Sequence, residues 1–242
     1  MKAFLFKKLS LIVLLLFLYT RCFSVNTGDL GSVKTEQRKV ENFTKIENEI
    51  NADIYITQGE LEDIRITAQE KILQELIVNV KNGKLTIALP HNFKRYNRVV
   101  LYVKAPDVSH IALLGSGSVL SENVWQLHKL HLSIVGSGDI KAKFNVQELI
   151  GKIAGSGDMN LNGTAANCEF NIAGSGNILG QDLQAEDMKI SIAGSGDAKI
   201  NVSKSLKVRI AGSGSVLYKG DPKIMDTDIA GSGKCKKWIS IV

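Results

Sequence analysis

Polar side chains recur at one position after a repeated Gly-Ser-Gly tripeptide, and they are the residues best suited to chemistry. Asp139, Asp158, Asn177 and Asp197 follow four successive copies of the tripeptide. A row of oxygen ligands on one side of a molecule would suit a cation or a sugar. Turn chemistry is the alternative, and it is favoured, because Asp and Asn also accept hydrogen bonds from neighbouring backbone amides. These four residues form the candidate binding ladder.

Catalysis is the less favoured use of the same carboxylates. Paired carboxyl groups about 5–9.5 Å apart can cleave glycosides, and Asp139 and Asp158, one repeat apart, would approach the lower end of that range. An enzyme site, however, usually interrupts a repeat with additional residues, whereas these repeats are nearly uniform. We therefore assign no catalytic residue.

Other chemical signatures do not appear in the sequence. His128 and His131 would face opposite sides of a strand and so could not share a metal. The sequence contains no Ser-His-Asp set, Cys-x-x-Cys, phosphate-binding loop or zinc signature. We expect no metal and no cofactor.

The tripeptide itself marks a structural repeat. It occurs seven times, at intervals of 21, 19, 19, 20, 18 and 19 residues. A period of this length is typical of a stacked repeat protein. The first glycines are Gly115, Gly136, Gly155, Gly174, Gly194, Gly212 and Gly231.

Alignment on the first glycine predicts which residues face inward. Apolar residues stand two and six positions before it and four positions after it, and these even offsets are typical of strands with one buried face. The column two positions before the glycine is Leu113, Ile134, Ile153, Ile172, Ile192, Ile210 and Ile229. The second glycine shares the inward parity, and the serine between the glycines faces outward.

The repeats therefore predict an all-β fold, a single-stranded parallel β-helix with about seven coils of roughly 19 residues. Parallel connections favour a right-handed coil. The six intervals would give a column about 29 Å tall at the usual strand spacing. Cys168 and Cys235 lie three coils apart, too far for a disulfide, and are expected to be buried free thiols.

The region before the repeats should cap the solenoid. Candidate strands span residues 53–57, 63–68, 76–80, 84–88 and 99–103, and Asn82-Gly83 predicts a hairpin turn. We divide the chain into a signal peptide (1–24), a flexible linker (25–36), an irregular β cap (37–110) and the repeats (111–242), with 37–242 forming one continuous domain.

The first residues resemble an export signal. Lys2, Lys7 and Lys8 precede an apolar run that is too short to span a bilayer. Cleavage after Ser24 fits best, and lipidation of Cys22 is the alternative and the one expected route to a membrane. Removal of residues 1–24 would lower the net charge from +6 to +2. The remaining lysines are scattered, which argues against nucleic acid as a partner.

These features together resemble the putative auto-transporter adhesin, head GIN domain family, found mainly in Bacteroidetes envelopes. The resemblance runs from about Arg38 to the end of the chain. It rests on the segments 38–46 and 53–59 and on the Gly-Ser-Gly-Asp/Asn series. It implies a β-helical fold, and it supplies neither a ligand nor catalytic residues.

We expect an exported, non-catalytic protein of the periplasm, outer membrane or cell surface, with an adhesin-like binding or structural role. The expected partner is a polysaccharide or another surface component. A polysaccharide lyase or glycoside hydrolase on the same scaffold is the alternative function. The ligand and the oligomeric state do not follow from the sequence.

Overall fold

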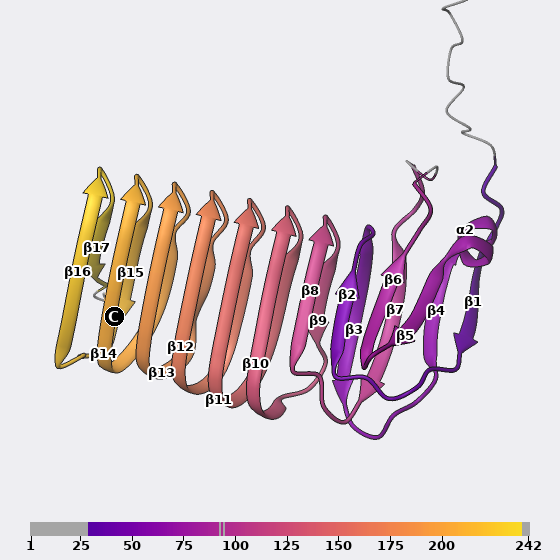
Figure 1. The fold of residues 1–242 in the computed structure, drawn as a ribbon, viewed down its shortest axis with the longest axis horizontal. Coiled ribbons are helices and arrows are strands. Elements are labelled where there is room, and N and C mark those ends of the chain that lie inside the picture. Colours follow the sequence, from indigo (N-terminus) through magenta and orange to yellow (C-terminus); the bar gives the residue numbers. More distant parts are fainter. Residues whose placement is uncertain (1–28, 92, 94, 239–242) are drawn as a thin grey trace, which may run out of the picture.

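The computed structural model describes residues 29–91, 93 and 95–238, which form a row of stacked β-coils with a cap at one end (Figure 1). The expected signal peptide and the Cys22 anchor lie outside the described residues. The cap and first coil comprise β1 (Val33–Arg38), β2 (Lys45–Asn48), β3 (Ala52–Gln58), β4 (Ile64–Gln69), α2 (Glu70–Glu75), β5 (Ile77–Lys81), β6 (Lys84–Ala88) and β7 (Val99–Ala105). The repeats comprise β8 (His110–Gly115), β9 (Ser118–Ser121), β10 (Trp125–Gly136), β11 (Asp139–Gly155), β12 (Met159–Gly174), β13 (Ile178–Gly194), β14 (Ala198–Gly212), β15 (Ser215–Lys219), β16 (Ile224–Gly231) and β17 (Lys234–Lys237).

The repeats form the predicted parallel β-solenoid. Strands β10 to β14 pair in chain order, and each Gly-Ser-Gly turn lies over the preceding one. Strands β11 to β14 are 15 to 17 residues long, because each runs from one turn almost to the next and bends at the far corner. A coil is therefore one long strand and one glycine turn.

The predicted inward columns are confirmed by the strand register. Ile172 pairs with Ile153 in the preceding coil and with Ile192 in the following one, and all three are buried. The columns at the other two even offsets pair in the same way, with Cys168 between Leu149 and Met188. The serines of all seven tripeptides are exposed, as their odd offset predicts.

Both glycines of each turn are required by the stacking. The first glycines have φ values from 124° to 139°, a region that side chains disfavour. The φ values of the second glycines lie outside this region, but a Cβ on Gly176 would overlap the carbonyl oxygen of Gly157 beneath it. Backbone bonds join the turns, since the amide of Ser175 donates to the oxygen of Gly155 at 2.9 Å.

The cap contains the antiparallel element that was predicted. β1 pairs with β4, β4 with β7, and β5 with β6, all antiparallel. The five predicted strands are confirmed to within two residues at each end. Strand β2 lies between β6 and β8, and β3 between β7 and β9, so chain order and stacking order differ here.

The flexible linker predicted over residues 25–36 is wrong in its last four residues. Val33–Arg38 is strand β1, which pairs with β4 across six residues. Its sequence is polar because this edge strand buries little of its surface. The helix α2 and the short strand β2 were also not predicted.

The close approach of the turns predicts a contrast between two buried glycines that lie four residues apart in the chain. Gly176→Ala should lower the free energy of unfolding by about 2 kcal/mol or more, because the methyl group has no space beside the Gly157 backbone. Gly180→Ala should change it by less than about 0.5 kcal/mol, because its nearest neighbour would lie 3.5 Å away. Urea unfolding of both variants measures the contrast, and equal losses would contradict the role of the turn.

Candidate binding surface

The four residues of the binding ladder do lie in one column, and their side chains bond to the backbone of the next coil. Asp139 Oδ1 accepts from the amide of Asp158 at 3.1 Å, and Asp158 Oδ1 accepts from the amide of Asn177 at 2.9 Å. Asn177 Oδ1 in turn accepts from the amide of Asp197 at 3.0 Å. The series ends where Asp197 Oδ1 accepts from the amide of Ser215 at 2.7 Å. Each side chain thus ties its turn to the turn stacked on it.

These bonds give the ladder a structural role, which is the turn chemistry that the sequence favoured. An asparagine serves as well as an aspartate, because the bond needs one acceptor oxygen and no charge. Asn177 also separates the carboxylates of Asp158 and Asp197. Its Nδ2 donates to Asp158 Oδ1 at 2.9 Å, and its Oδ1 accepts from the backbone amide of Asp197. Among the described residues no group of three or more His, Cys, Asp or Glu side chains is arranged to hold a metal ion. Ligand binding by the ladder remains a prediction.

A groove on another part of the coils was not predicted. It has a volume of about 740 Å³ and crosses six coils on the outer face of the strands that precede the turns. Its floor is the column one position before the first glycine: Val135, Ala154, Ala173, Ala193, Ala211 and Ala230. These side chains are exposed, and none of the four ladder residues lines the groove. The ladder and the groove are separate surfaces.

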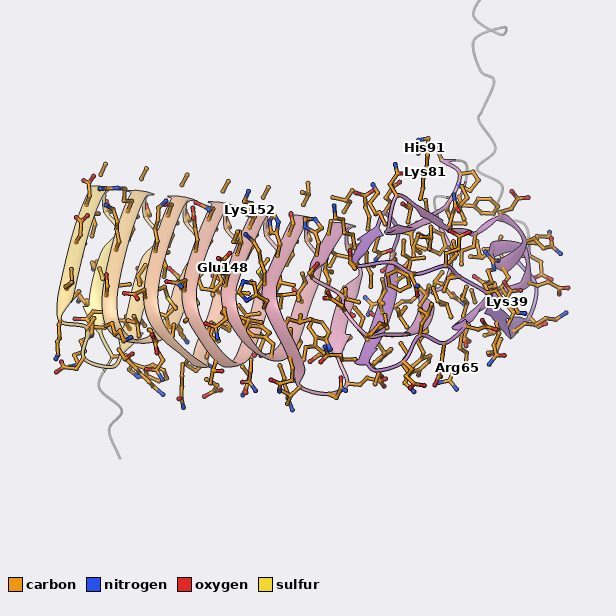
Figure 2. All side chains as sticks on the ribbon, turned by 60° about the horizontal axis from the view of Figure 1, so that its bottom comes forward. Lys39, Arg65, Lys81, His91, Glu148 and Lys152 are labelled. Carbon is orange, nitrogen blue, oxygen red and sulfur yellow. The ribbon has the colours of Figure 1, made fainter. Side chains whose placement is uncertain are left out.

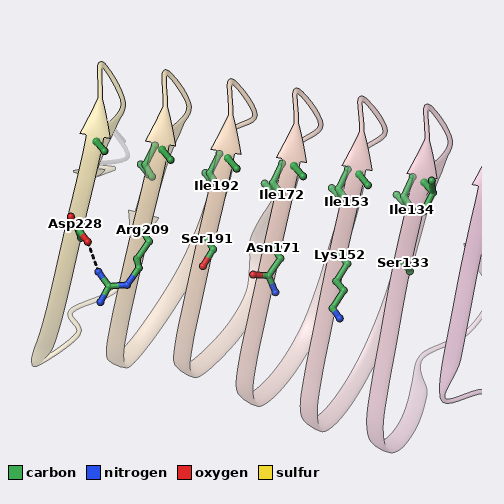
Figure 3. A pocket seen from close by; sticks show the side chains of 17 residues that line it. Ser133, Ile134, Lys152, Ile153, Asn171, Ile172, Ser191, Ile192, Arg209 and Asp228 are labelled. Atoms are coloured by element: carbon green, nitrogen blue, oxygen red, sulfur yellow. Dashed lines mark hydrogen bonds and ion pairs between the residues drawn. The ribbon is translucent and has the colours of Figure 1, made fainter.

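Polar side chains form one border of the groove, one from each coil (Figure 3). Ser133, Lys152, Asn171, Ser191, Arg209 and Asp228 make up this column. Lys152 projects from β11 in the middle of the solenoid (Figures 2 and 3). Arg209 is fixed by an ion pair with Asp228 at 2.7 Å. The groove therefore combines an apolar floor with hydrogen-bond donors and acceptors at nearly regular spacing.

The signal for this groove is present in the sequence at odd offsets. Odd positions face outward, and one position before the glycine the outward residue is alanine in five successive coils. A methyl group beside longer neighbours leaves a depression, and repetition joins the depressions into a channel. The polar residues at odd offsets predicted the ladder, whereas no prediction was drawn from the small apolar residues at odd offsets.

The structure brings together a histidine pair that was not predicted; the pair weighed from the sequence was His128 with His131. His110 and His131 lie on neighbouring coils and meet edge to face, with ring centroids 4.5 Å apart and an interplanar angle of 85°. Burial lowers the pKa of His131, and the nearby His110 lowers it further. Burial followed by the charge of Lys45 lowers the pKa of His110. Both rings are therefore more readily neutral in the folded chain than in the unfolded one.

The cysteines form no disulfide within the described part of the chain, as predicted. Cys168 is buried, and burial raises the pKa of its thiol to about 12. The prediction of full burial is wrong for Cys235, which is half-buried because it belongs to the last coil. Its pKa is also raised by burial.

Comparison with known proteins agrees with this architecture. The family model described as "Putative auto-transporter adhesin, head GIN domain" matches residues 42–222. The chain belongs to this family. No curated protein matches the sequence. None of the helices in the described residues is long and apolar enough to cross a membrane.

Solved structures of similar proteins extend the comparison. A putative adhesin from Bacteroides fragilis is 28% identical, with a TM-score of 0.79, over 86% of this chain and 97% of the other. A putative lipid binding protein from Parabacteroides distasonis is 24% identical, with a TM-score of 0.73, over 86% and 98%. A putative adhesin from Parabacteroides merdae is 19% identical, with a TM-score of 0.68, over 86% and 97%. The β-solenoid fold is thus shared across these chains.

The ladder bonds predict that Asp158 acts as an acceptor and not as a charge. Asp158→Ala should lower the free energy of unfolding by about 1–2 kcal/mol, because the amide of Asn177 loses its side-chain partner. Asp158→Asn should lose much less, because its remaining oxygen can accept as Asn177 does one coil later. Urea unfolding measures both, and equal losses would mean that the charge matters.

The histidine pair predicts a pH dependence of stability. A lowered pKa in the folded state means that stability is complete above the ordinary histidine pKa and is lost as the pH falls through the folded value. Melting temperatures measured between about pH 8 and pH 5.5 should fall for the native chain. His131→Gln should reduce that fall. An identical pH profile in the variant would exclude the pair as its source.

Proposed function

We propose that this head GIN protein is an exported, non-catalytic component of the cell envelope, in the periplasm or at the cell surface, that binds an extended polysaccharide. Membership of the family and similarity to the putative adhesin of Bacteroides fragilis support an adhesin-like role. The groove is the surface that we assign to binding, and the polysaccharide is its proposed ligand.

The observation that carries this proposal is the continuity of the groove across six coils. The coils are spaced about 4.8 Å apart, so the five intervals from Val135 to Ala230 span roughly 24 Å. A long, shallow surface of this kind suits a chain molecule better than a compact ligand, which needs a more enclosed site. Its repeating pattern of methyl groups and polar side chains also suits a ligand that repeats.

The chemistry of the border matches sugars. Sugar rings present apolar faces of C–H groups together with hydroxyl groups at their edges. The alanine floor would contact the apolar faces, and Asn171, Ser191 and Lys152 would exchange hydrogen bonds with the hydroxyls. A carboxylate-bearing sugar would gain a further contact from Lys152. Catalysis is not favoured, because the carboxylates of the ladder lie outside the groove and hold the turns.

A single arginine placed in the groove tests the proposal. Ala173→Arg puts a long charged side chain on the floor and should weaken polysaccharide binding about tenfold or more, since each tenfold is about 1.4 kcal/mol. Asn160→Arg adds the same side chain to an exposed position of the same strand, outside the groove, and should bind as the native chain does. Binding to an array of bacterial polysaccharides measures both.

Three results would overturn the proposal. Equal binding by the Ala173→Arg and native chains would place the ligand elsewhere. Release of reducing ends or unsaturated products from a bound polysaccharide would indicate an enzyme. A native chain that binds none of the polysaccharides would leave the structural role of the solenoid as its function.

A further inference from the structure

The two ends of the solenoid are built differently. At the N-terminal end, strand β1 and helix α2 lie beyond the stacked coils (Figure 1). At the other end, the last coil consists of β16, which pairs with β14, and β17, which pairs with β15. Within the residues that the structure describes, no strand pairs with the outer edges of β16 and β17. These edges carry backbone donors and acceptors that can accept a further strand.

The inward side chains of this last coil are incompletely covered. Met225 is 45% exposed, whereas its counterpart Leu206, one coil earlier, is fully buried. Ile229 is half-buried, whereas its counterpart Ile210 is 2% exposed. The end of the solenoid is thus a cross-section through its apolar core.

The outward side chains at this end are divided by charge. Strand β16 presents Asp226 and Asp228, with side chains 51% and 69% exposed. Strand β17 presents Lys234 and Lys236 at the corresponding outward positions, and both residues are exposed. The aspartates pair with Lys207 and Arg209 of the preceding coil, but their exposure leaves them accessible from outside. One wall of the last coil is acidic and the other is basic.

We propose that this end surface binds a second copy of the same chain, coil end to coil end. The Gly-Ser-Gly bend makes β16 and β17 run in opposite directions on the two walls of the coil. A two-fold axis parallel to these strands would therefore place β16 of each copy beside β17 of its partner, antiparallel. Acidic and basic walls then meet at both contacts, and Met225 and Ile229 are covered.

Charge excludes the other ways of joining two such ends. A two-fold axis across the strands would place β16 against β16 and β17 against β17, with like charges adjacent. The same repulsion opposes uncontrolled pairing of identical edges, which is a general use of charge on edge strands. The arrangement is also closed, since a two-fold contact uses the end of both copies and leaves the capped ends outside.

Charge reversal on one strand at a time tests the proposal by sedimentation velocity of the exported chain. The native chain should form a dimer. The pair Lys234→Asp and Lys236→Asp should be monomeric, because both walls are then acidic. The pair Asp226→Lys and Asp228→Lys should also be monomeric, because both are basic. An equimolar mixture of the two variants should dimerise, since each acidic wall again meets a basic one.

A control variant and a truncation complete the experiment. Lys141→Asp with Lys143→Asp reverses two exposed charges in the middle of the solenoid and should leave the dimer intact. A monomeric native chain, or a dimer that neither end variant dissociates, would overturn the proposal. Dimerisation seen only after deletion of residues 239–242 would overturn it too, and would assign the end surface to the chain's own terminus. Circular dichroism establishes that each variant is folded.

Discussion

The contact between successive glycine turns is the constraint on which the rest of the structure depends. Gly157 and Gly176 approach so closely that a Cβ on the upper residue would overlap the carbonyl oxygen of the lower one. The carbonyl oxygen of one turn lies where a side chain would stand on the next, so the backbone itself sets the spacing. The paired turns bring the flanking strand positions of successive coils into register, so that Ile153, Ile172 and Ile192 stack.

Uniform turns explain both the regular core and the regular exterior. Because each coil starts from an equivalent point, isoleucine lies on isoleucine inside, and serine and aspartate recur outside. As a result, the side chains that hold the coils together and the side chains that a ligand could contact lie in different columns. The Asp and Asn side chains beside the turns bond to the next coil, as Asp158 does to Asn177, and so contribute to stacking. The alanine column on the adjoining wall makes no such bond and is available to a ligand.

The alternation of inward and outward positions along a strand was sufficient to predict the repeat core. It did not predict the edge strand β1, the strand order next to the cap or the groove. The even-offset columns were predicted residue by residue because a period of two is a local property of a strand. Strand β1 was missed because an edge strand needs few apolar residues. The places of β2 between β6 and β8 and of β3 between β7 and β9 were not predictable, since no sequence repeat links these strands. The groove was missed because a depression in the surface depends on the sizes of the side chains on either side of the alanine column.

The stacking of similar coils must also end, and the two ends of the solenoid prevent further stacking in different ways. The antiparallel cap ends the parallel stacking at one end by changing the direction of the strands. At the other end Cys235 has the same register as the buried Ile140 and Ile178, and yet it is half-buried. Its exposure follows solely from its being in the last coil. Charge there opposes like-with-like pairing, so any partner must present the opposite charge on each wall, and a second copy turned about the strand direction does so.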